Sequence, residues 1–308
     1  MKPSKDVGVF MKVQVRESIL RIKNPTVKKF SELWKQHQPF VIEDVAKDWD
    51  ASKKWCNKYL IEQCGNNLVP VRFYHPNFWH NSENYAYEDG YEPKKEIKFH
   101  EYINKHIENT IQENNLECYL SEAYFEDRFP ELVRDITYPE YFDRKAFVTF
   151  WYGFSSKNFS STTNLHFDPL HNIFAQIRGR KRILLYPPSD YLSFYPPLDG
   201  TSGVGFNSKV NPDLSNLELF PKFPRQDKIE IILQPGEILY IPPFWWHHLT
   251  AVDENISLSF WYDLKIEDFF KQKNMLSVFL NIAPHYLSYA ISSGKFREFM
   301  GFLKTMFH

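Results

Sequence analysis

The chain has 308 residues, which is enough for one large domain or two ordinary ones. Its 43% hydrophobic and 24% charged residues match globular averages and exclude a disordered or fibrous chain. A net charge of −1 at pH 7 argues against a general polyanion binder, although a local basic surface stays open. Aromatic residues reach 18%, so one large core can form without disulfides.

The cysteines and the apolar segments bear on the compartment. Cys56, Cys64 and Cys118 have no CxxC spacing, so we expect free thiols in a reducing compartment. The first residues lack the apolar segment of a secretory signal, and the most apolar late stretch, 275–291, is too interrupted to span a membrane. We therefore expect a soluble cytoplasmic protein without membrane contact, with a nuclear location open if the source is eukaryotic.

Residues 1–115 mix helical and strand patterns, and we predict an α/β elaboration that packs on the core. The helical patterns cover residues 31–34, 49–64 and 99–112, and short strand patterns cover 39–42 and 69–74. Residues 77–95 are polar and rich in turn formers, which indicates a surface excursion.

Short strand patterns dominate from residue 116 to residue 263. They cover residues 118–120, 146–152, 172–178, 181–186, 229–233, 237–241, 247–251 and 257–262. Many short strands separated by Pro and Gly favour a β-barrel or sandwich over alternating βαβ units. Gly179-Arg180 fits a two-residue hairpin turn with Gly first. The pattern becomes helical again over 264–308, so we predict a mainly β fold with flanking helices.

The sharpest local feature is His166-Phe167-Asp168. Residues i and i+2 of a strand point to the same face, so this imidazole and carboxylate would converge. Alone, the pattern is more typical of an ordinary surface or capping pair. A distal histidine is offered by His247-His248, which follow Trp245-Trp246; because neighbours on a strand face opposite ways, only one of the two can join.

Two histidines and one carboxylate form a facial triad that holds Fe(II) and leaves positions for a 2-oxo acid and dioxygen. The carboxylate and the lack of nearby cysteines favour iron over structural zinc. A 2-oxo diacid also needs a cation for its distal carboxylate. Lys181 is a candidate, because it lies on a strand after His166-Phe167-Asp168, just past the predicted hairpin turn. Thr163 would add a hydroxyl donor. A lone lysine is more often a solvated surface charge, and the triad reverses that preference.

Residues 160–262 resemble the JmjC/cupin-type Fe(II)- and 2-oxoglutarate-dependent oxygenases. The matching blocks, in order, are 172–182, Tyr186-Pro187-Pro188, Asn211-Pro212-Asp213, 235–242, 245–248 and Phe260-Trp261-Tyr262. Within this family the chain is most similar to the asparaginyl hydroxylase that acts on hypoxia-inducible factor. The resemblance implies a double-stranded β-helix (jelly-roll or cupin) core over 116–263. It also implies that helices in 264–308 form a homodimer.

The resemblance also implies roles for individual residues. It implies His166, Asp168 and His247 as the iron ligands, and Lys181 and Thr163 as 2-oxoglutarate contacts. It further implies that Asn172 lines the same pocket, that Tyr119 hydrogen-bonds the distal carboxylate of 2-oxoglutarate, and that Trp261 lies beside substrate or cofactor. His248 is then a supporting or packing residue, and we expect His171 to line the pocket.

The chain departs from the hydroxylase in two places. Ser259 stands where the hydroxylase has an asparagine near the cofactor, and the loop between Pro197 and Asn211 is rich in Gly and Ser. Because family substrate contacts lie around this loop, the identity of the substrate does not transfer.

The sequence therefore predicts a dioxygenase that uses Fe(II), 2-oxoglutarate and dioxygen to hydroxylate a side chain of a protein or peptide, with Asn, Asp or His favoured. A transfer-RNA or small-molecule hydroxylase is an alternative, and the near-neutral charge argues weakly against nucleic acid. Lysine demethylation is less favoured, because nothing resembles a histone-reader module. A non-catalytic cupin-like binding protein would not need the triad and Lys181 together, and a metal-dependent isomerase has no evident use for Lys181.

Overall fold

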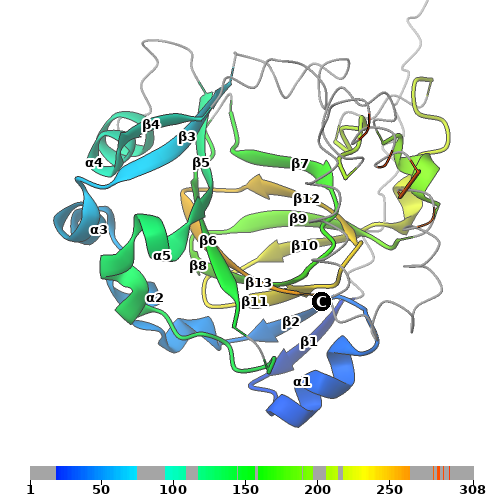
Figure 1. The fold of residues 1–308 in the computed structure, drawn as a ribbon, viewed down its shortest axis with the longest axis horizontal. Helices are drawn as coiled ribbons and strands as arrows, with labels where there is room; N and C mark the ends of the chain where they lie inside the picture. The colour runs from blue at the N-terminus through cyan, green and yellow to red at the C-terminus, as the bar shows by residue number, and fades with distance from the viewer. Residues whose placement is uncertain are drawn as a thin grey trace, which may run out of the picture.

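A computed structural model describes residues 19–74, 94–108, 117–143, 145–156, 159–188, 190–196, 206–213 and 218–263, with isolated positions between 280 and 291. The described strands form two sheets that face each other, with helices flanking the larger one (Figure 1). The predicted fold class, mainly β with flanking helices around a cupin core, is confirmed.

The larger sheet has nine strands. Their order is β1 (Leu20–Lys23), β2 (Phe40–Glu43), β11 (Ile238–Ile241), β8 (His171–Arg178), β13 (Asn255–Tyr262), β6 (Phe147–Gly153), β5 (Glu117–Tyr124), β3 (Leu68–Tyr74) and β4 (Lys95–Lys98). Only β1 and β2 are parallel, and the other pairs are antiparallel. The smaller sheet is antiparallel, in the order β10 (Ile229–Leu233), β9 (Lys181–Tyr186), β12 (Trp246–Ala251) and β7 (Thr162–His166).

Alternation along the strands assigns one face of the nine-stranded sheet to the helices. On β6, Phe150 faces outward and packs against Trp55, Phe125 and Phe129, whereas Thr149 and Trp151 face the space between the sheets. The helices on the outer face are α1 (Val27–Trp34), α2 (Asp50–Lys54), α3 (Asn57–Cys64), α4 (Phe99–Glu101) and α5 (Phe125–Arg128) (Figure 1). The aromatic surplus therefore fills a large core between sheet and helices.

Two of the helices that the sequence predicts differ in the structure. The single helix over 49–64 is divided into α2 and α3, because Trp55 leaves the helical conformation and its indole donates to the buried Asp135. The helix over 99–112 begins as α4 and continues as a π-helical segment to Glu108, and residues 109–112 lie outside the described part.

The predicted hairpin at Gly179-Arg180 is wrong. β8 and β9 do not pair, because β8 belongs to the larger sheet and β9 to the smaller one. Gly179 has a φ of +62°, as the turn chemistry predicts, but the turn is a corner that carries the chain between sheets. A Cβ at Gly179 would lie 1.9 Å from the carbonyl oxygen of Glu254, so only glycine fits this corner.

The predicted N-terminal unit shares the nine-stranded sheet with the core. β2 pairs with β11, and β3 pairs with β5, so the sheet runs across the predicted boundary at residues 115 and 116. Most of the predicted C-terminal helices and most of the 77–95 excursion lie outside the described residues. No helix within the described ranges has the length and apolar character that a membrane crossing needs.

A second, smaller core covers the outer face of the four-stranded sheet. It contains Leu165, Phe167, Leu184, Tyr186, Tyr191, Phe194, Val210, Phe223, Phe244 and Trp246. Phe194 stacks on Trp246 with ring centroids 4.5 Å apart, and Trp246 meets Phe167 edge-on at 4.8 Å. Phe167, Phe244 and Trp246 of this core lie in the chain segments that also carry His166, Asp168 and His247.

Candidate metal centre and adjoining cavity

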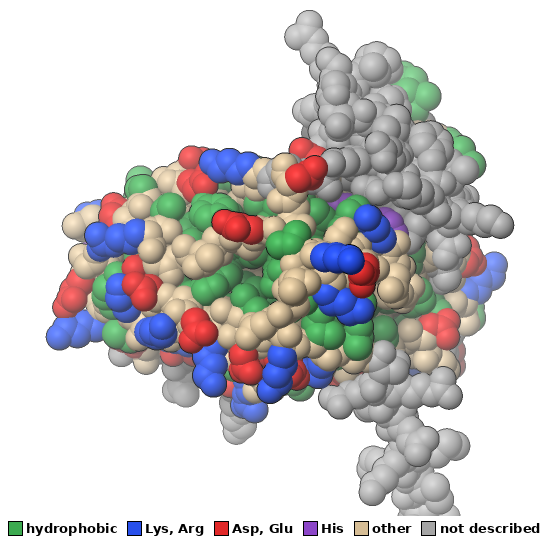
Figure 2. Space-filling model, turned by 90° about the horizontal axis from the view of Figure 1, so that it is seen from below, with side chains coloured by type: hydrophobic (Ala, Val, Ile, Leu, Met, Phe, Trp, Pro, Cys, Tyr) green, Lys and Arg blue, Asp and Glu red, His purple; other side chains and the backbone are tan. Residues whose placement is uncertain are grey.

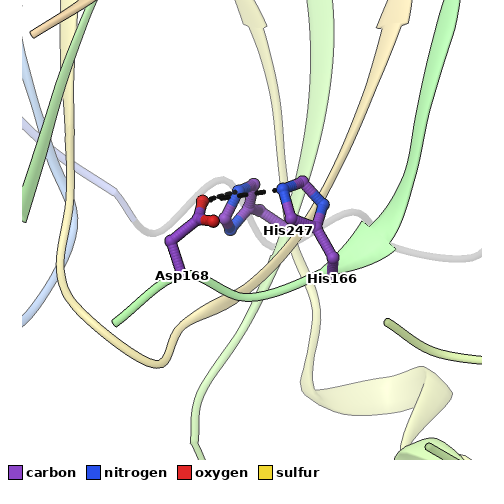
Figure 3. Close-up of side chains that lie close together, drawn as sticks. All are labelled: His166, Asp168 and His247. Carbon is purple, nitrogen blue, oxygen red and sulfur yellow. Dashed lines mark ion pairs between the residues drawn. The ribbon is translucent and has the colours of Figure 1, made fainter. Parts of the chain in front are cut away.

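His166, Asp168 and His247 converge at one end of the four-stranded sheet (Figure 3). His166 ends β7, His247 is the second residue of β12, and the two are direct partners across the strands. The Asp168 Oδ2 atom lies 3.2 Å from His247 Nε2 and 3.5 Å from His166 Nε2. One ligand atom from each residue therefore lies within 4.8 Å of the other two, so that a single ion could contact all three.

Asp168 lies in the loop that follows β7, whereas the sequence predicted that His166 and Asp168 share one face of a strand. β7 ends at His166, Phe167 and Asp168 follow outside the strand, and the chain bends at Pro169 and Leu170. The bend is held by backbone bonds on both sides: Phe167 N–H donates to Phe206 O, and Phe244 N–H donates to Asp168 O. Phe167 points away into the second core, which leaves His166 and Asp168 on the cavity side.

Hydrogen bonds fix the tautomer of both histidines. His166 Nδ1 lies 2.7 Å from Asn164 O, and His247 Nδ1 lies 2.8 Å from Trp245 O. A carbonyl oxygen only accepts, so each Nδ1 carries the hydrogen and each Nε2 presents a lone pair toward Asp168. Metal-binding histidines in proteins are oriented in this way.

The charges of the three groups are suited to a cation. Burial opposes ionisation of Asp168, but the two histidines outweigh it and hold the pKa of this carboxyl well below its usual range. Burial and the neighbouring His166 lower the pKa of His247, whereas the Asp168 carboxylate overcomes burial and raises the pKa of His166. Asp168 Oδ2 is buried and accepts no hydrogen bond from any residue that the structure describes. A buried carboxylate oxygen facing two imidazole lone pairs fits a divalent metal, and the donor set is that of a facial Fe(II) site.

A cavity adjoins the triad between the two sheets, and all eight residues predicted for the site line it. From the four-stranded side these are Thr163, His166, Lys181 and His247, together with Asp168 from the loop; from the nine-stranded side they are Tyr119, Asn172 and Trp261. The structure therefore brings the predicted metal and cofactor residues into one place, although the roles assigned to them remain predictions.

Lys181 is the one lysine or arginine among the described residues that line this cavity. It is 1% exposed, its ammonium donates to the Tyr119 hydroxyl at 3.2 Å, and it faces the rings of Phe174 and Tyr119. No carboxylate among the described residues pairs with it. Burial lowers the pKa of Lys181 to about 7. A buried lysine with a hydroxyl neighbour and no acidic partner is suited to receive a carboxylate from a ligand.

The neighbours of Lys181 complete a polar inner end. The Tyr119 hydroxyl also interacts with the Thr163 side chain. Asn172 faces the cavity, and its buried Oδ1 has no hydrogen-bond partner in the described ranges. Toward the outside, Trp261 donates to Thr149 at 2.9 Å and stacks on the exposed Phe147.

The sequence reasoning missed further lining residues. Trp151 lines the cavity and donates to Thr149 and to Ser259, the residue that the resemblance had already placed near the cofactor. Phe174 lies two residues after Asn172 on the same face of β8, so strand alternation could have found it. Glu122 also lines the cavity. It lies in a β-bulge of β5 and has a φ of +54°, and the local sequence does not indicate this bulge.

The two additional histidines lie away from the cavity. His171 points to the helix side of β8, where its Nδ1 lies 2.9 Å from the Tyr240 hydroxyl and its ring meets Trp34, so the prediction that it lines the pocket is wrong. His248 points outward from β12, and its Nε2 lies 3.4 Å from Asp213 Oδ2. This position agrees with the supporting role expected for His248.

Comparisons with known proteins agree with this architecture. The family model described as "Cupin-like domain" matches residues 26–268. JmjC domain-containing protein D of Dictyostelium discoideum is 32% identical over 259 residues, covering 76% of this chain and 54% of that protein. Lysine-specific demethylase 8 of Xenopus tropicalis is 29% identical over 252 residues, covering 80% of this chain and 53% of that protein. The tRNA wybutosine-synthesizing protein 5 of Danio rerio is 29% identical over 265 residues, covering 78% and 74%.

These relatives limit what can be transferred. The chain spans about half the length of the first two relatives, so their whole-protein activities do not carry over. None of the three is named as an asparaginyl hydroxylase, and the closer resemblance to that enzyme therefore stays a prediction.

Proposed function

Because the chain belongs to the cupin-like domain family, we propose that it is an Fe(II)- and 2-oxoglutarate-dependent dioxygenase that hydroxylates a side chain of a protein or peptide. One observation carries the proposal: the triad opens into the same cavity as the buried Lys181, and within the described part of the chain neither Asp168 Oδ2 has a hydrogen-bond partner nor Lys181 an acidic one. A metal-binding scaffold needs the first feature only. A cosubstrate with a distal carboxylate accounts for both.

In this proposal each wall residue has a separate task. His166, Asp168 and His247 would hold Fe(II), which when bound supplies the oxidative chemistry with dioxygen and 2-oxoglutarate. Lys181 would pair with the distal carboxylate of 2-oxoglutarate, and Tyr119 and Thr163 would orient it by hydrogen bonds. Asn172 would offer a polar contact beside the metal, and Trp261 would contact the substrate at the outer end. The dry, aromatic walls would exclude bulk water from the reacting groups.

The protein-substrate proposal concerns an Asn, Asp or His side chain. Its support is the block resemblance over residues 160–262 and the partial exposure of His166 and Asp168, at 18% and 26%, beside the cavity that Trp261 lines. A homodimer through residues 264–308 and a cytoplasmic location are part of the same proposal.

A transfer-RNA hydroxylase is the second candidate. It is favoured by the relative named for tRNA wybutosine synthesis, because the chain covers 74% of that protein. It is opposed by the net charge of −1, since phosphate contacts need basic side chains. On the face shown in Figure 2, the described basic and acidic side chains are interspersed rather than gathered into one basic surface.

The proposal is tested by substrate-independent turnover. Protein prepared without oxygen and loaded with Fe(II) should convert 2-oxoglutarate to succinate slowly when air is admitted, and His166→Ala should not. Absence of turnover in the unaltered protein, together with unchanged metal content in His166→Ala, would reject the oxygenase and favour a cupin-like binding protein.

The substrate is then sought by mass spectrometry. Co-purifying proteins, candidate peptides and bulk tRNA are incubated with the enzyme and with His166→Ala, and the products are compared for the gain of one oxygen atom. Oxygen found only in tRNA would replace the protein-substrate proposal with the second candidate.

A further inference from the structure

We propose that Asp213 is a positioning residue that orients the metal centre and the cosubstrate anchor from outside the cavity. The inference rests on the proposed function, because it concerns the same metal and the same Lys181. Asp213 lies on the outer side of the four-stranded sheet, close to the second core, and does not line the cavity. Its effect would therefore be transmitted through the residues that it binds.

The first connection runs to the strand of Lys181. Arg182 Nη1 donates to both oxygens of Asp213, at 2.8 and 3.0 Å. Arg182 follows Lys181 directly on β9, and consecutive strand residues point to opposite faces. The Arg182–Asp213 pair thus holds the outer side of β9 at the point where Lys181 projects inward.

The second connection runs to the strand of a metal ligand. His248 is buried, and its Nε2 lies 3.4 Å from Asp213 Oδ2. His248 follows His247 on β12, so it faces outward where His247 faces the metal centre. One carboxylate therefore contacts the outward neighbours of both Lys181 and His247.

The third connection is the segment that ends at Asp213. Ser208 N–H donates to Leu165 O, and Phe167 N–H donates to Phe206 O, so this segment pairs with β7 on both sides of His166. Asn207 lies opposite His166 in that pairing. Asn211 Oδ1 accepts from Asp213 N–H at 3.0 Å and shapes the turn that presents the carboxylate.

Asp213 is the described residue in which these three connections meet. Outer partners of metal ligands commonly contribute 10–100-fold to metal affinity, because they hold the ligands in orientation. Removal of the Asp213 charge would free His248 and the Nη1 of Arg182 together and leave Arg182 held by Glu230 alone, which would weaken the outer support of His247 and Lys181. Glu230 provides a matched comparison, since it accepts from Arg182 Nε at 2.5 Å but contacts neither His248 nor the 206–213 segment in any described bond.

The test uses Co(II) as a probe for the metal centre in the full-length protein. Dissociation constants and visible spectra of bound Co(II) are measured for the unaltered chain, Asp213→Asn, Asp213→Glu and Glu230→Gln, with thermal unfolding in parallel. We expect Asp213→Asn to bind Co(II) on the order of tenfold more weakly and with an altered spectrum. It should also bind 2-oxoglutarate more weakly, whereas Glu230→Gln should match the unaltered chain in both.

Asp213→Glu keeps the charge on a longer side chain and should fall between the other two. It also carries the test if Asp213→Asn does not fold. Unaltered Co(II) affinity and spectrum in the folded Asp213 variant would overturn the inference, as would an equal loss in Glu230→Gln. A failure of the unaltered chain to bind Co(II) would instead reject the proposed function, and the inference with it.

Discussion

The two sheets face each other across the cavity and contribute different chemistry to it. The four-stranded sheet and the loop after β7 carry the two histidines, Asp168 and Lys181. The nine-stranded sheet contributes neutral side chains with the exception of Glu122; they are Tyr119, Trp151, Asn172, Phe174, Ile241, Ser259 and Trp261. The candidate metal ligands and the lysine suited to the distal carboxylate therefore lie on one wall. The other wall adds the hydroxyl of Tyr119 and the amide of Asn172 to a largely aromatic surface.

The difference follows from what supports each wall. The four-stranded sheet has its own core, in which Phe167 and Trp246 interleave with His166, Asp168 and His247 along the chain. A rigid aromatic packing on the outer face fixes charged groups on the inner face. The nine-stranded sheet is backed by helices and carries none of the three predicted metal ligands, so we expect metal chemistry to depend on the smaller sheet and substrate choice on the larger one.

The largest effect is expected on the charged wall at Asp168. Asp168→Asn keeps the shape but removes the charge that faces the two imidazoles. Because the loss of a supporting partner alone costs 10–100-fold in metal affinity, we expect the loss of this ligand to exceed about 100-fold. Metal content after dialysis measures it. Asp253→Asn, which removes a carboxylate from the exposed pair with Arg180, is the control and should retain its metal.

Lys181→Met should weaken the binding of 2-oxoglutarate without changing the binding of the metal. The change keeps a long side chain but removes the charge-assisted bond, worth about 1.5–3 kcal/mol, so 2-oxoglutarate should bind roughly 10–100-fold more weakly. Calorimetry of 2-oxoglutarate binding gives this value, and metal affinity should be unchanged. Lys228→Met, at a surface lysine that pairs with Glu230, is the control. Equal binding in Lys181→Met and the control would contradict the assignment of the anchor.

The pH dependence of 2-oxoglutarate binding sharpens the same contrast. Since burial lowers the pKa of Lys181 to about 7, the free protein loses this charge as the pH rises, and ligand binding must restore it. Affinity should therefore fall roughly tenfold per pH unit above about pH 7. Calorimetry in buffers of different ionisation enthalpy should detect proton uptake. Lys181→Met should show neither the slope nor the uptake.

The same shift has a consequence for stability. Lys181 in the unfolded chain has an ordinary, higher pKa, so between the two values the unfolded state binds more protons than the folded one. The contribution of Lys181 to the free energy of unfolding should therefore rise with pH above about 7. The affinity for 2-oxoglutarate should fall over the same pH range. Thermal unfolding measured across this pH range should show the rise in the unaltered chain and not in Lys181→Met.

The smallest effect is expected on the neutral wall. Trp261→Leu removes an aromatic contact worth roughly 0.5–1.5 kcal/mol, so the ratio of hydroxylated substrate to succinate should fall about two- to tenfold. The change should leave the Co(II) affinity unaltered, because Trp261 belongs to the opposite sheet. A loss of metal in Trp261→Leu would show that the two walls are not separable.

The sequence could predict most strands of the core, because runs such as Ile229–Leu233 and Asn255–Tyr262 are rich in apolar, β-branched and aromatic residues. It did not predict β1 and β4, since Leu20–Lys23 and Lys95–Lys98 are short, lysine-containing edge strands without an apolar run. The corner at Gly179 shows another limit. A turn residue indicates a positive φ, but not which sheet the next strand joins.

The residues of the candidate site were predictable because they lie in short ordered blocks with recognisable chemistry. The network around Asp213 was not, since Arg182, His248 and Asp213 meet only after three separate segments have folded. Asn211-Pro212-Asp213 was recognised as a block, but nothing in its pattern indicates which strands it holds. Glu122 depends on a bulge in β5, which local sequence does not specify.

The corner at Gly179 also bears on the order in which ligands can enter and leave. Lys181 directly follows this connection and is 1% exposed, whereas the His166 and Asp168 side chains are 18% and 26% exposed. The cavity is thus closed at the lysine and open beyond the triad. A ligand that pairs with Lys181 must enter before a larger molecule covers the opening, and its remnant must leave afterwards. We therefore expect compulsory-order kinetics, with the small diacid binding first and departing last.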